Sequence, residues 1–423
     1  MIFTWLVLLI QGLICGLFRD RIWFIDNIDH ISWLIILFTS IAFLFDIIRI
    51  NTSTKNVILI LLGYFLRIVL LLWDIYCSHI FRLPNSGRDS EMYQEIALQE
   101  YQGLIVSRPN MYSRFLAHLY QLFGPQRIIG QYVNILLGVM SVLIALKILR
   151  KYKVAKPMQT LALVVGMLIP SYILINSILL RESSIIFLLS VSIYCFVLWL
   201  KDNKVTCFIL AVVLSLVAAT FHSGAIAPAL GYAACLAFYD SRQRNFRFNK
   251  STLFLTTICL LVFFIIYNRF EDVIFAKFSG ADSISDITNS ISEGSGGSGY
   301  SIAIKTGNDL VDMVVNTPIR IGYFILAPLP WDWRGINDII AFVFSALFYG
   351  YCYFLSYKAL RNSLFPNREL IIALFVMSVI SAFVFAWGVK NAGTAMRHRD
   401  KFFIQYLLIF ALCFKYKSRA ISN

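Results

Sequence analysis

Apolar residues recur along the chain in runs of about 17–22, the length that carries a helix across ~30 Å of hydrocarbon. Inside lipid, each backbone amide must be bonded within its own segment, so helices are the expected form of these runs. The pattern predicts an all-α, polytopic transmembrane helix bundle of about 12 helices, with residues 1–423 forming a single membrane domain. The predicted spans lie near 2–18, 31–48, 56–73, 128–148, 158–179, 184–200, 205–221, 224–239, 252–267, 337–357, 369–388 and 402–414.

Composition leads to the same class of protein. Hydrophobic residues make up 59% of the chain and charged residues 14%, with a mean hydropathy of +0.74. A soluble domain carries roughly 25% charged residues, so this chain lacks the polar surface to cover a globule. The eight cysteines include no CxxC or CxxH pair, which predicts neither a zinc site nor a disulfide framework. We expect no metal and no cofactor.

Lysine and arginine collect in alternate loops, and this asymmetry predicts the orientation. One set of loops, together with the C-terminus, holds 19 basic and four acidic residues, whereas the rest of the chain holds 18 basic and 19 acidic residues. Short cytoplasmic loops carry the excess of basic residues, so both termini are predicted to be cytoplasmic. Topology and anionic lipid account for the net charge of +14, and a nucleic-acid partner is not needed to explain it.

Two large segments are then expected on the outer face, at 74–127 and 268–336. In the first, Asp89 or Ser90 is predicted to cap a helix that passes through Tyr93, four residues from Asp89 on the same face. Residues 111–123 form an amphipathic pattern that predicts a helix on the membrane surface. A carboxylate held there suits a general base for a sugar hydroxyl, although Asp89 could equally be a simple cap.

Several charged residues lie where a membrane protein usually avoids them. Arg397 and Arg399 precede the last span on the outer side, where guanidinium groups beside a helix N-terminus would bind phosphate or carboxylate. Pairing with outer acids is the alternative. Arg67 lies inside the third span and either lines a cavity or extends to the interface. Arg181 and Glu182 lie between two spans, as a structural ion pair or as part of a functional site.

Other outer residues complete the set of candidates. His222 lies at a tight turn between two spans, where it either caps the turn or carries protons, and His398 follows Arg397. Trp331 and Trp333 follow two prolines and either anchor the chain at the interface or stack on a sugar.

Taken together, these motifs resemble those of bacterial membrane glycosyltransferases of the GT-C type, and most closely the Wzy-type and EpsG-like polymerases of polysaccharide repeat units. The resemblance rests on the order of five short motifs across most of the chain: Gly87-Arg88-Asp89-Ser90-Glu91-Met92-Tyr93, Leu180-Arg181-Glu182-Ser183, Phe221-His222-Ser223, Pro328-Leu329-Pro330-Trp331 and Arg397-His398-Arg399. The first outer loop lacks the Asp-Glu or Asp-Asp pair of many single-sugar enzymes, and the chain has no large soluble C-terminal domain. Both departures favour a polymerase.

The resemblance implies transfer of undecaprenyl-diphosphate-linked oligosaccharide repeat units, at the outer face of a bacterial inner membrane, to build capsule, exopolysaccharide or O-antigen. Arg67, Arg181, Arg397 and Arg399 would bind the diphosphate. Asp89, His222 or Glu182 would take the acceptor proton, and Arg88, Tyr93, His398, Trp331 and Trp333 would contact the substrate. A flippase, a chain-length regulator and membrane lipid would be partners. The alternatives are a GT-C enzyme that adds single sugars from a polyprenyl-phosphate donor, and a transporter or flippase of lipid-linked oligosaccharide.

Overall fold

The structure is a computed structural model in which helices and one two-stranded sheet are the regular elements among the described residues. It describes residues 1–18, 28–50, 52–106, 109–240, 245–246, 254, 257, 299, 304–389 and 391–414. Contacts divide the chain into two compact units, here called unit 1 (Met1–Leu146 with Leu163–Phe187) and unit 2 (Lys147–Ala162 with Leu188–Asn423). Three helices, α7, α8 and α10, contribute residues to both units.

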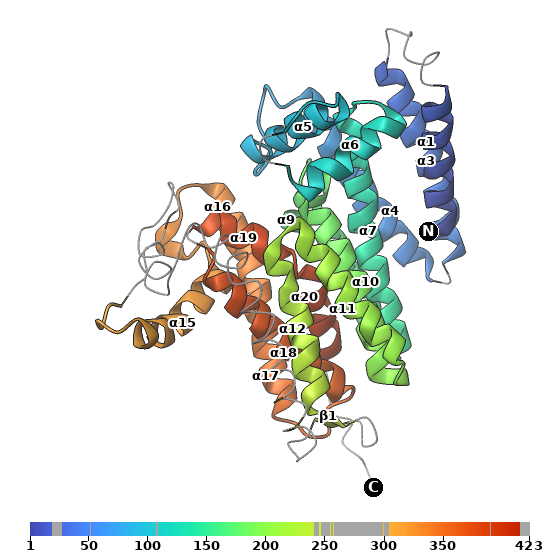
Figure 1. Cartoon of the computed structure of the whole chain (residues 1–423). Helices are drawn as coiled ribbons and strands as arrows, with labels where there is room; N and C mark the ends of the chain where they lie inside the picture. The colour runs from blue at the N-terminus through green and yellow to red at the C-terminus, as the bar shows by residue number, and fades with distance from the viewer. Residues whose placement is uncertain are drawn as a thin grey trace. The chain divides into compact units, whose positions relative to one another are not determined.

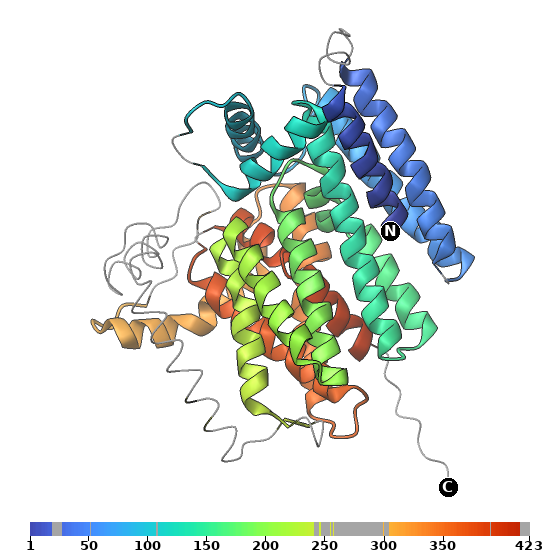
Figure 2. The same cartoon turned by 45° about the vertical axis from the view of Figure 1, so that its right-hand side comes forward.

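Unit 1 is built around its N-terminal helices. It contains α1 (Ile2–Leu17), α3 (Ile28–Arg49), α4 (Thr54–Tyr76), α5 (Arg88–Tyr101), α6 (Met111–Phe123), most of α7 (Arg127–Lys151), the end of α8 (Lys156–Leu168), and α9 (Pro170–Ser177). Figures 1 and 2 show α1 beside α3. The N-terminal amine lies 3.3 Å from Asp46 near the end of α3, and the Thr4 hydroxyl donates to the same carboxylate at 2.7 Å. Buried partners therefore neutralise the charge of Asp46.

Unit 2 holds a bundle in which α11, α12, α17, α18 and α20 lie side by side (Figures 1 and 2). Tyr239 pairs with Phe246 in the antiparallel sheet. The elements of unit 2 are α10 (Glu182–Asp202, apart from its first residues), α11 (Val205–Phe221), η1 (Ser223–Ile226), α12 (Ala227–Phe238), β1 (Tyr239–Asp240), β2 (Asn245–Phe246), α15 (Asp309–Leu326), η2 (Pro330–Asp332), α16 (Ile336–Ala341), η3 (Phe342–Ala346), α17 (Leu347–Leu360), α18 (Arg368–Ala386), α19 (Ala392–Asp400) and α20 (Phe403–Cys413).

Six of the described helices are long and apolar enough to cross a membrane, or seven if the bent pair α8–α9 is one span. Shorter apolar helices stand where further spans are predicted, at α1, α11, α12 and α20. The predicted span 252–267 lies almost entirely outside the described residues. The all-α class is therefore confirmed for the described part of the chain, and the count of about 12 spans stays a prediction.

The apolar helices also present large hydrophobic side chains outward. On α1, Leu9 and Leu13 are about half exposed, and on α3 Leu37 and Phe45 are similarly exposed. Water-soluble proteins rarely leave such continuous apolar surface uncovered. These helices therefore have the surface chemistry of membrane spans.

Contacts bring several basic loops together at one end of unit 2. Lys151 pairs with Asp202 at 2.8 Å, Lys201 donates to the Lys151 carbonyl, and Asn367 reaches the Tyr152 carbonyl at 3.4 Å. These loops belong to the set that the charge pattern assigns to the cytoplasm. Helix α11 begins after Lys204, another basic residue of that set, and His222 follows its opposite end. At 1.5 Å per residue, this helix is about 25 Å long.

Residues 309–326, which lie in the second predicted outer segment, form α15, which buries Asp312, Asn316 and Arg320 at helical spacing. Two local expectations are wrong. Gly87, rather than Asp89 or Ser90, is the N-cap of α5, and Asp89 lies in the first turn, where it complements the helix dipole. The apolar face of α6 packs inside unit 1 and not on the membrane surface, since Tyr112, Leu116 and Tyr120 are buried.

The close packing of α7 on α9 gives the first test of this fold. A Cβ atom added at Gly138 would lie 2.3 Å from the Asn176 side chain, so Gly138→Ala should lower the free energy of unfolding by about 1–3 kcal/mol. The matched control is Gly322→Ala on α15, where an added Cβ meets nothing within 4 Å. That variant should be unchanged or up to about 1 kcal/mol more stable. Thermal unfolding of the purified protein measures both, and equal stability of the two variants would contradict the α7–α9 packing.

Candidate functional site

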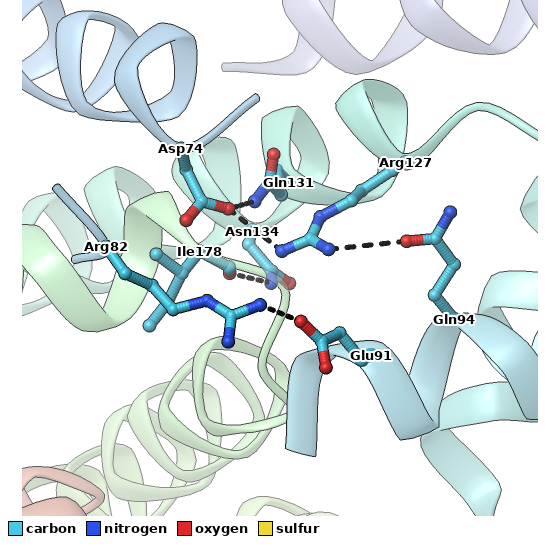
Figure 3. Close-up of polar contacts among 8 residues, drawn as sticks. All are labelled: Asp74, Arg82, Glu91, Gln94, Arg127, Gln131, Asn134 and Ile178. Atoms are coloured by element: carbon cyan, nitrogen blue, oxygen red, sulfur yellow. Dashed lines mark hydrogen bonds and ion pairs between the residues drawn. The ribbon is translucent and has the colours of Figure 1, made fainter. Parts of the chain in front are cut away.

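A buried ion pair joins the end of α4 to the start of α7 in unit 1. Asp74 lies in the last turns of α4, and its carboxylate oxygen Oδ2 accepts from Arg127 Nη2 at 2.9 Å and from Gln131 Nε2 at 2.5 Å (Figure 3). The Asp74 side chain is 1% exposed and that of Arg127 21%. A carboxylate this deep is stable only because a cation and an amide neutralise it.

The network continues onto α5. Arg127 Nη1 donates to Gln94 Oε1 at 3.4 Å, and Arg82 pairs with Glu91 on the exposed side of the same helix (Figure 3). Helix α5 packs against α6, where the Tyr93 and Tyr112 rings meet edge to face at 5.2 Å. The α5–α6 hairpin is therefore linked to the ion pair through Gln94.

Asn134, on the following turn of α7, serves the segment after α9. Its Nδ2 donates to the Ile178 carbonyl at 3.0 Å (Figure 3). The same atom donates to the Leu180 carbonyl at 2.9 Å. It also lies 3.0 Å from the Tyr112 hydroxyl. Burial raises the pKa of the Tyr112 phenol well above its usual range, although this hydrogen bond acts in the opposite direction. Tyr112 therefore stays protonated.

Arg67 is fully buried and bonds to backbone carbonyls. Pro170 has no N–H, so the Gly166 carbonyl four residues before it loses its helical donor, and α8 and α9 meet at 52°. Arg67 Nη2 donates to that carbonyl at 3.4 Å, and Nη1 donates to the Met167 carbonyl at 3.1 Å. The guanidinium thus replaces backbone donors at a broken helix, a role that the sequence analysis did not consider.

Unit 1 also contains most of the predicted residues of the first half of the chain. The Arg181 guanidinium lies 5.8 Å from the centre of the Tyr93 ring. Glu182 is buried in the first turn of α10 and acts electrostatically on Tyr112. Asp89 is half-buried and Arg88 exposed at the start of α5. The edge-to-face pair Tyr93 and Tyr112 therefore links Arg181 to Glu182. Arg67 instead bonds at the break between α8 and α9.

In unit 2, Arg399 bonds to the end of α15. Its Nη1 donates to the carbonyls of Ile325 at 2.6 Å and Ala327 at 2.9 Å, and reaches that of Phe324 at 3.3 Å. Pro328 cannot donate to the Phe324 carbonyl, so this arrangement repeats that of Arg67. The structure places Arg397 and Arg399 in the last turn of α19. Both arginines also precede α20, but the helix end nearest to them is the C-terminus of α19, which carries partial negative charge. The anion site therefore stays a prediction.

Two predicted histidines meet in unit 2. The His222 ring, at the turn after α11, lies 4.7 Å from the His398 ring of α19, and both contact the Phe385 ring. Lys401, which is 1% exposed, has its Nζ 2.8 Å from His398 Nδ1 and lies over the same phenylalanine. We call His222, His398 and Lys401 the histidine–lysine cluster. It concentrates donors and positive charge in one place.

The remaining predicted residues of unit 2 lie in separate contacts. Trp331 is exposed, and its indole N–H donates to the Tyr323 hydroxyl at 3.0 Å. The Trp333 indole donates to the Pro328 carbonyl at 3.2 Å. Arg320 of α15, which the sequence analysis missed, is buried over the Trp387 ring. Within the described ranges, His, Cys, Asp and Glu side chains form no group of three that could hold a metal ion.

Asp74, Arg127, Gln131 and Lys401 are not among the site residues predicted from the sequence. Asp74 and Arg127 each lie at the edge of an apolar run, where a charged residue ordinarily marks a helix end. The signal was available in Gln131, a polar residue one turn inside a predicted span. Comparison of the chain with protein-family models, with curated proteins and with solved structures gives no match.

The role assigned to Arg67 can be tested by coupling it to the proline. Arg67→Leu removes the donor of buried carbonyls. It should lower the free energy of unfolding by about 1–3 kcal/mol for each carbonyl left without a donor. In a Pro170→Ala background the new N–H can bond to the Gly166 carbonyl, so the same substitution should cost less. Thermal unfolding of the four proteins measures the coupling, with the exposed Arg88→Leu as a control that leaves stability unchanged. An equal cost of Arg67→Leu in both backgrounds would rule out the proposed link to Pro170.

Proposed function

We propose that this chain is a bacterial membrane glycosyltransferase that joins undecaprenyl-diphosphate-linked oligosaccharide repeat units into a surface polysaccharide. The observation that carries the proposal is the histidine–lysine cluster, in which His222, His398 and Lys401 surround Phe385. The five motifs of the family resemblance support the same function. Exposed apolar helices suit an enzyme whose substrates are lipids.

The charge around the cluster favours an anion. Residues 392–401 carry three cationic side chains, Arg397, Arg399 and Lys401, and one carboxylate, Asp400. The Tyr349 hydroxyl donates to that carboxylate at 2.6 Å, and Arg399 is engaged with carbonyls of α15. We assign Lys401 and Arg397 of this positively charged segment to the diphosphate. In glycosyl transfer, negative charge grows on the leaving diphosphate, so fixed cations stabilise the transition state more than the ground state.

Hydrogen bonds assign the histidines a donor role. His222 Nδ1 accepts from the Gly224 amide at 3.2 Å, and His398 Nδ1 accepts from the Lys401 ammonium. With Lys401 charged, the proton of each neutral ring then lies on Nε2. This geometry favours His222 as a donor over its predicted role as a base. The family resemblance alone supports Asp89 as the residue that takes the acceptor proton.

The proposed step balances without a further reactant. The acceptor hydroxyl oxygen attacks the anomeric carbon of the donor repeat unit while the bond from that carbon to the diphosphate oxygen breaks. The hydroxyl proton passes to the base, and the diphosphate leaves with the bonding electron pair. Two predicted diphosphate ligands lie in unit 1, Arg67 and Arg181. The family resemblance alone supports them in this role, and Arg67 already bonds to backbone carbonyls.

The proposal includes a location and an orientation. About 12 spans would cross the bacterial inner membrane, with both termini and the basic loops in the cytoplasm. His222 and Lys204 lie at opposite ends of α11, and Lys204 belongs to the basic set. The histidine–lysine cluster would therefore face outward, where lipid-linked repeat units, a flippase and a chain-length regulator would meet the enzyme.

Gel analysis of surface glycan from a deletion strain tests this function. Loss of long chains, with single lipid-linked repeat units retained, is the expected result. Truncated repeat units would replace the proposal with an enzyme that adds single sugars, and complete units trapped on the inner leaflet would replace it with a flippase. Normal long chains would exclude all three functions.

Site variants test the residues. Arg397→Ala, Arg181→Ala and Lys401→Met should each reduce polymer about 100-fold or more, because removal of one transition-state partner costs that much. Arg361→Ala, an exposed arginine at the basic end of unit 2, is the matched control and should leave polymer unchanged. Immunoblots of membranes check that each variant is present. Normal polymer from both Arg397→Ala and Lys401→Met would overturn the anion site.

A further inference from the structure

Three buried polar atoms near the Asp74–Arg127 ion pair have no hydrogen-bond partner within the part of the chain that the structure describes. They are Asp74 Oδ1, Gln131 Oε1 and the Tyr120 hydroxyl. The Gln131 and Tyr120 side chains are at most 1% exposed, as is the Asp74 carboxylate. A buried polar atom without a partner costs free energy, and native proteins rarely retain one without a reason.

The three atoms belong to one neighbourhood. Gln131 bonds directly to Asp74, and Arg127 bonds to the same carboxylate oxygen (Figure 3). Helix α6 runs antiparallel along α7, with Tyr112 bonded to Asn134 and Leu116 against Gly130, and this register places Tyr120 near Arg127. Arg127 Nε is a fourth buried atom without a described partner. The neighbourhood therefore offers two acceptors, one donor and one hydroxyl that can do either.

This complement selects a class of ligand. Asp74 and Arg127 cancel each other's charge, so neither an anion nor a cation is favoured by net charge. Two acceptor oxygens would repel a phosphate, while the guanidinium would repel a metal ion. Adjacent hydroxyl groups both donate and accept, so a vicinal diol can satisfy all four atoms at once. Arg127 and Gln94 are partly exposed, which leaves the network in contact with the surface on one side.

We propose that Asp74, Gln131 and Tyr120 form a binding site for a vicinal diol, carried either by a sugar or by a glycerol headgroup. The sugar ring would also find aromatic surface, since the Tyr120 ring meets the half-buried Tyr101 edge to face. The site shares no residue with the histidine–lysine cluster and does not depend on glycosyl transfer, so the two proposals can fail separately.

Tyr120→Phe is the sharpest test, because it removes one ligand partner without removing a bond that the structure describes. Purified protein in detergent is titrated with D-glucose, D-galactose and glycerol, and binding is followed by saturation-transfer NMR. We expect binding by the wild type at millimolar concentration. Tyr120→Phe should bind about tenfold more weakly with an unchanged melting temperature, as expected for one lost hydrogen bond.

Tyr172→Phe is the matched control. The Tyr172 hydroxyl donates to the Gly138 carbonyl at 2.9 Å, away from the proposed site. Its loss should lower the melting temperature and leave diol affinity unchanged, the reverse of the result for Tyr120→Phe. Weakened binding in both variants, or in neither, would overturn the assignment of Tyr120.

Lipid nanodiscs separate the two sources of the diol. Tighter binding of glucose or galactose than of glycerol, unaffected by lipid, would assign the site to a sugar. Displacement of bound sugar or glycerol in nanodiscs of phosphatidylglycerol, but not of phosphatidylcholine, would assign it to the lipid headgroup. No response to any of the three diols would overturn the proposal and leave ordered water as the partner of these atoms. Polymer formation is not part of either measurement.

Discussion

A broken helix in an apolar protein leaves backbone carbonyls without donors, and this constraint shapes both units. Water cannot enter hydrocarbon to bond to such carbonyls, so the protein must supply the donors itself. Pro170 removes the donor of the Gly166 carbonyl, and Pro328 removes that of the Phe324 carbonyl. In each case a buried arginine, Arg67 or Arg399, approaches the freed carbonyl and its neighbours. Asn134 does the same for the segment after α9.

This shared arrangement changes what a buried arginine means in such a chain. A guanidinium inside a membrane protein is costly and ordinarily indicates a functional site. Here the partial negative charge of several carbonyls provides the compensation, because the ends of α8 and α15 also carry the negative end of a helix dipole. The fully buried arginines are therefore structural in their described contacts. We therefore base the functional proposal on Lys401 beside the two histidines.

The sequence predicted the apolar helices well, because a run of hydrophobic residues indicates a span without knowledge of its neighbours. The bounds of α6 match the predicted 111–123. Helix α15 escaped prediction because its buried face is polar and its exposed face apolar, with Asp312 and Asn316 bonded to the preceding loop. The contacts of the candidate sites could not be predicted, because they join residues far apart in the sequence. Arg67 bonds to a carbonyl 100 residues away, and the whole α5–α6 hairpin lies between Asp74 and Arg127 in the sequence.

Two kinds of buried polar group can now be separated by what they bond to. Arg67, Arg399 and Asn134 donate to backbone carbonyls that would otherwise lack a donor, so folding alone explains these contacts. Asp74, Gln131 and Tyr120 have neutral surroundings and yet keep oxygen atoms without a described donor. Folding gains nothing from such atoms, and an apolar side chain of similar shape would be at least as stable. The stability of the fold does not explain these oxygen atoms, whereas a bound ligand that donates to them does.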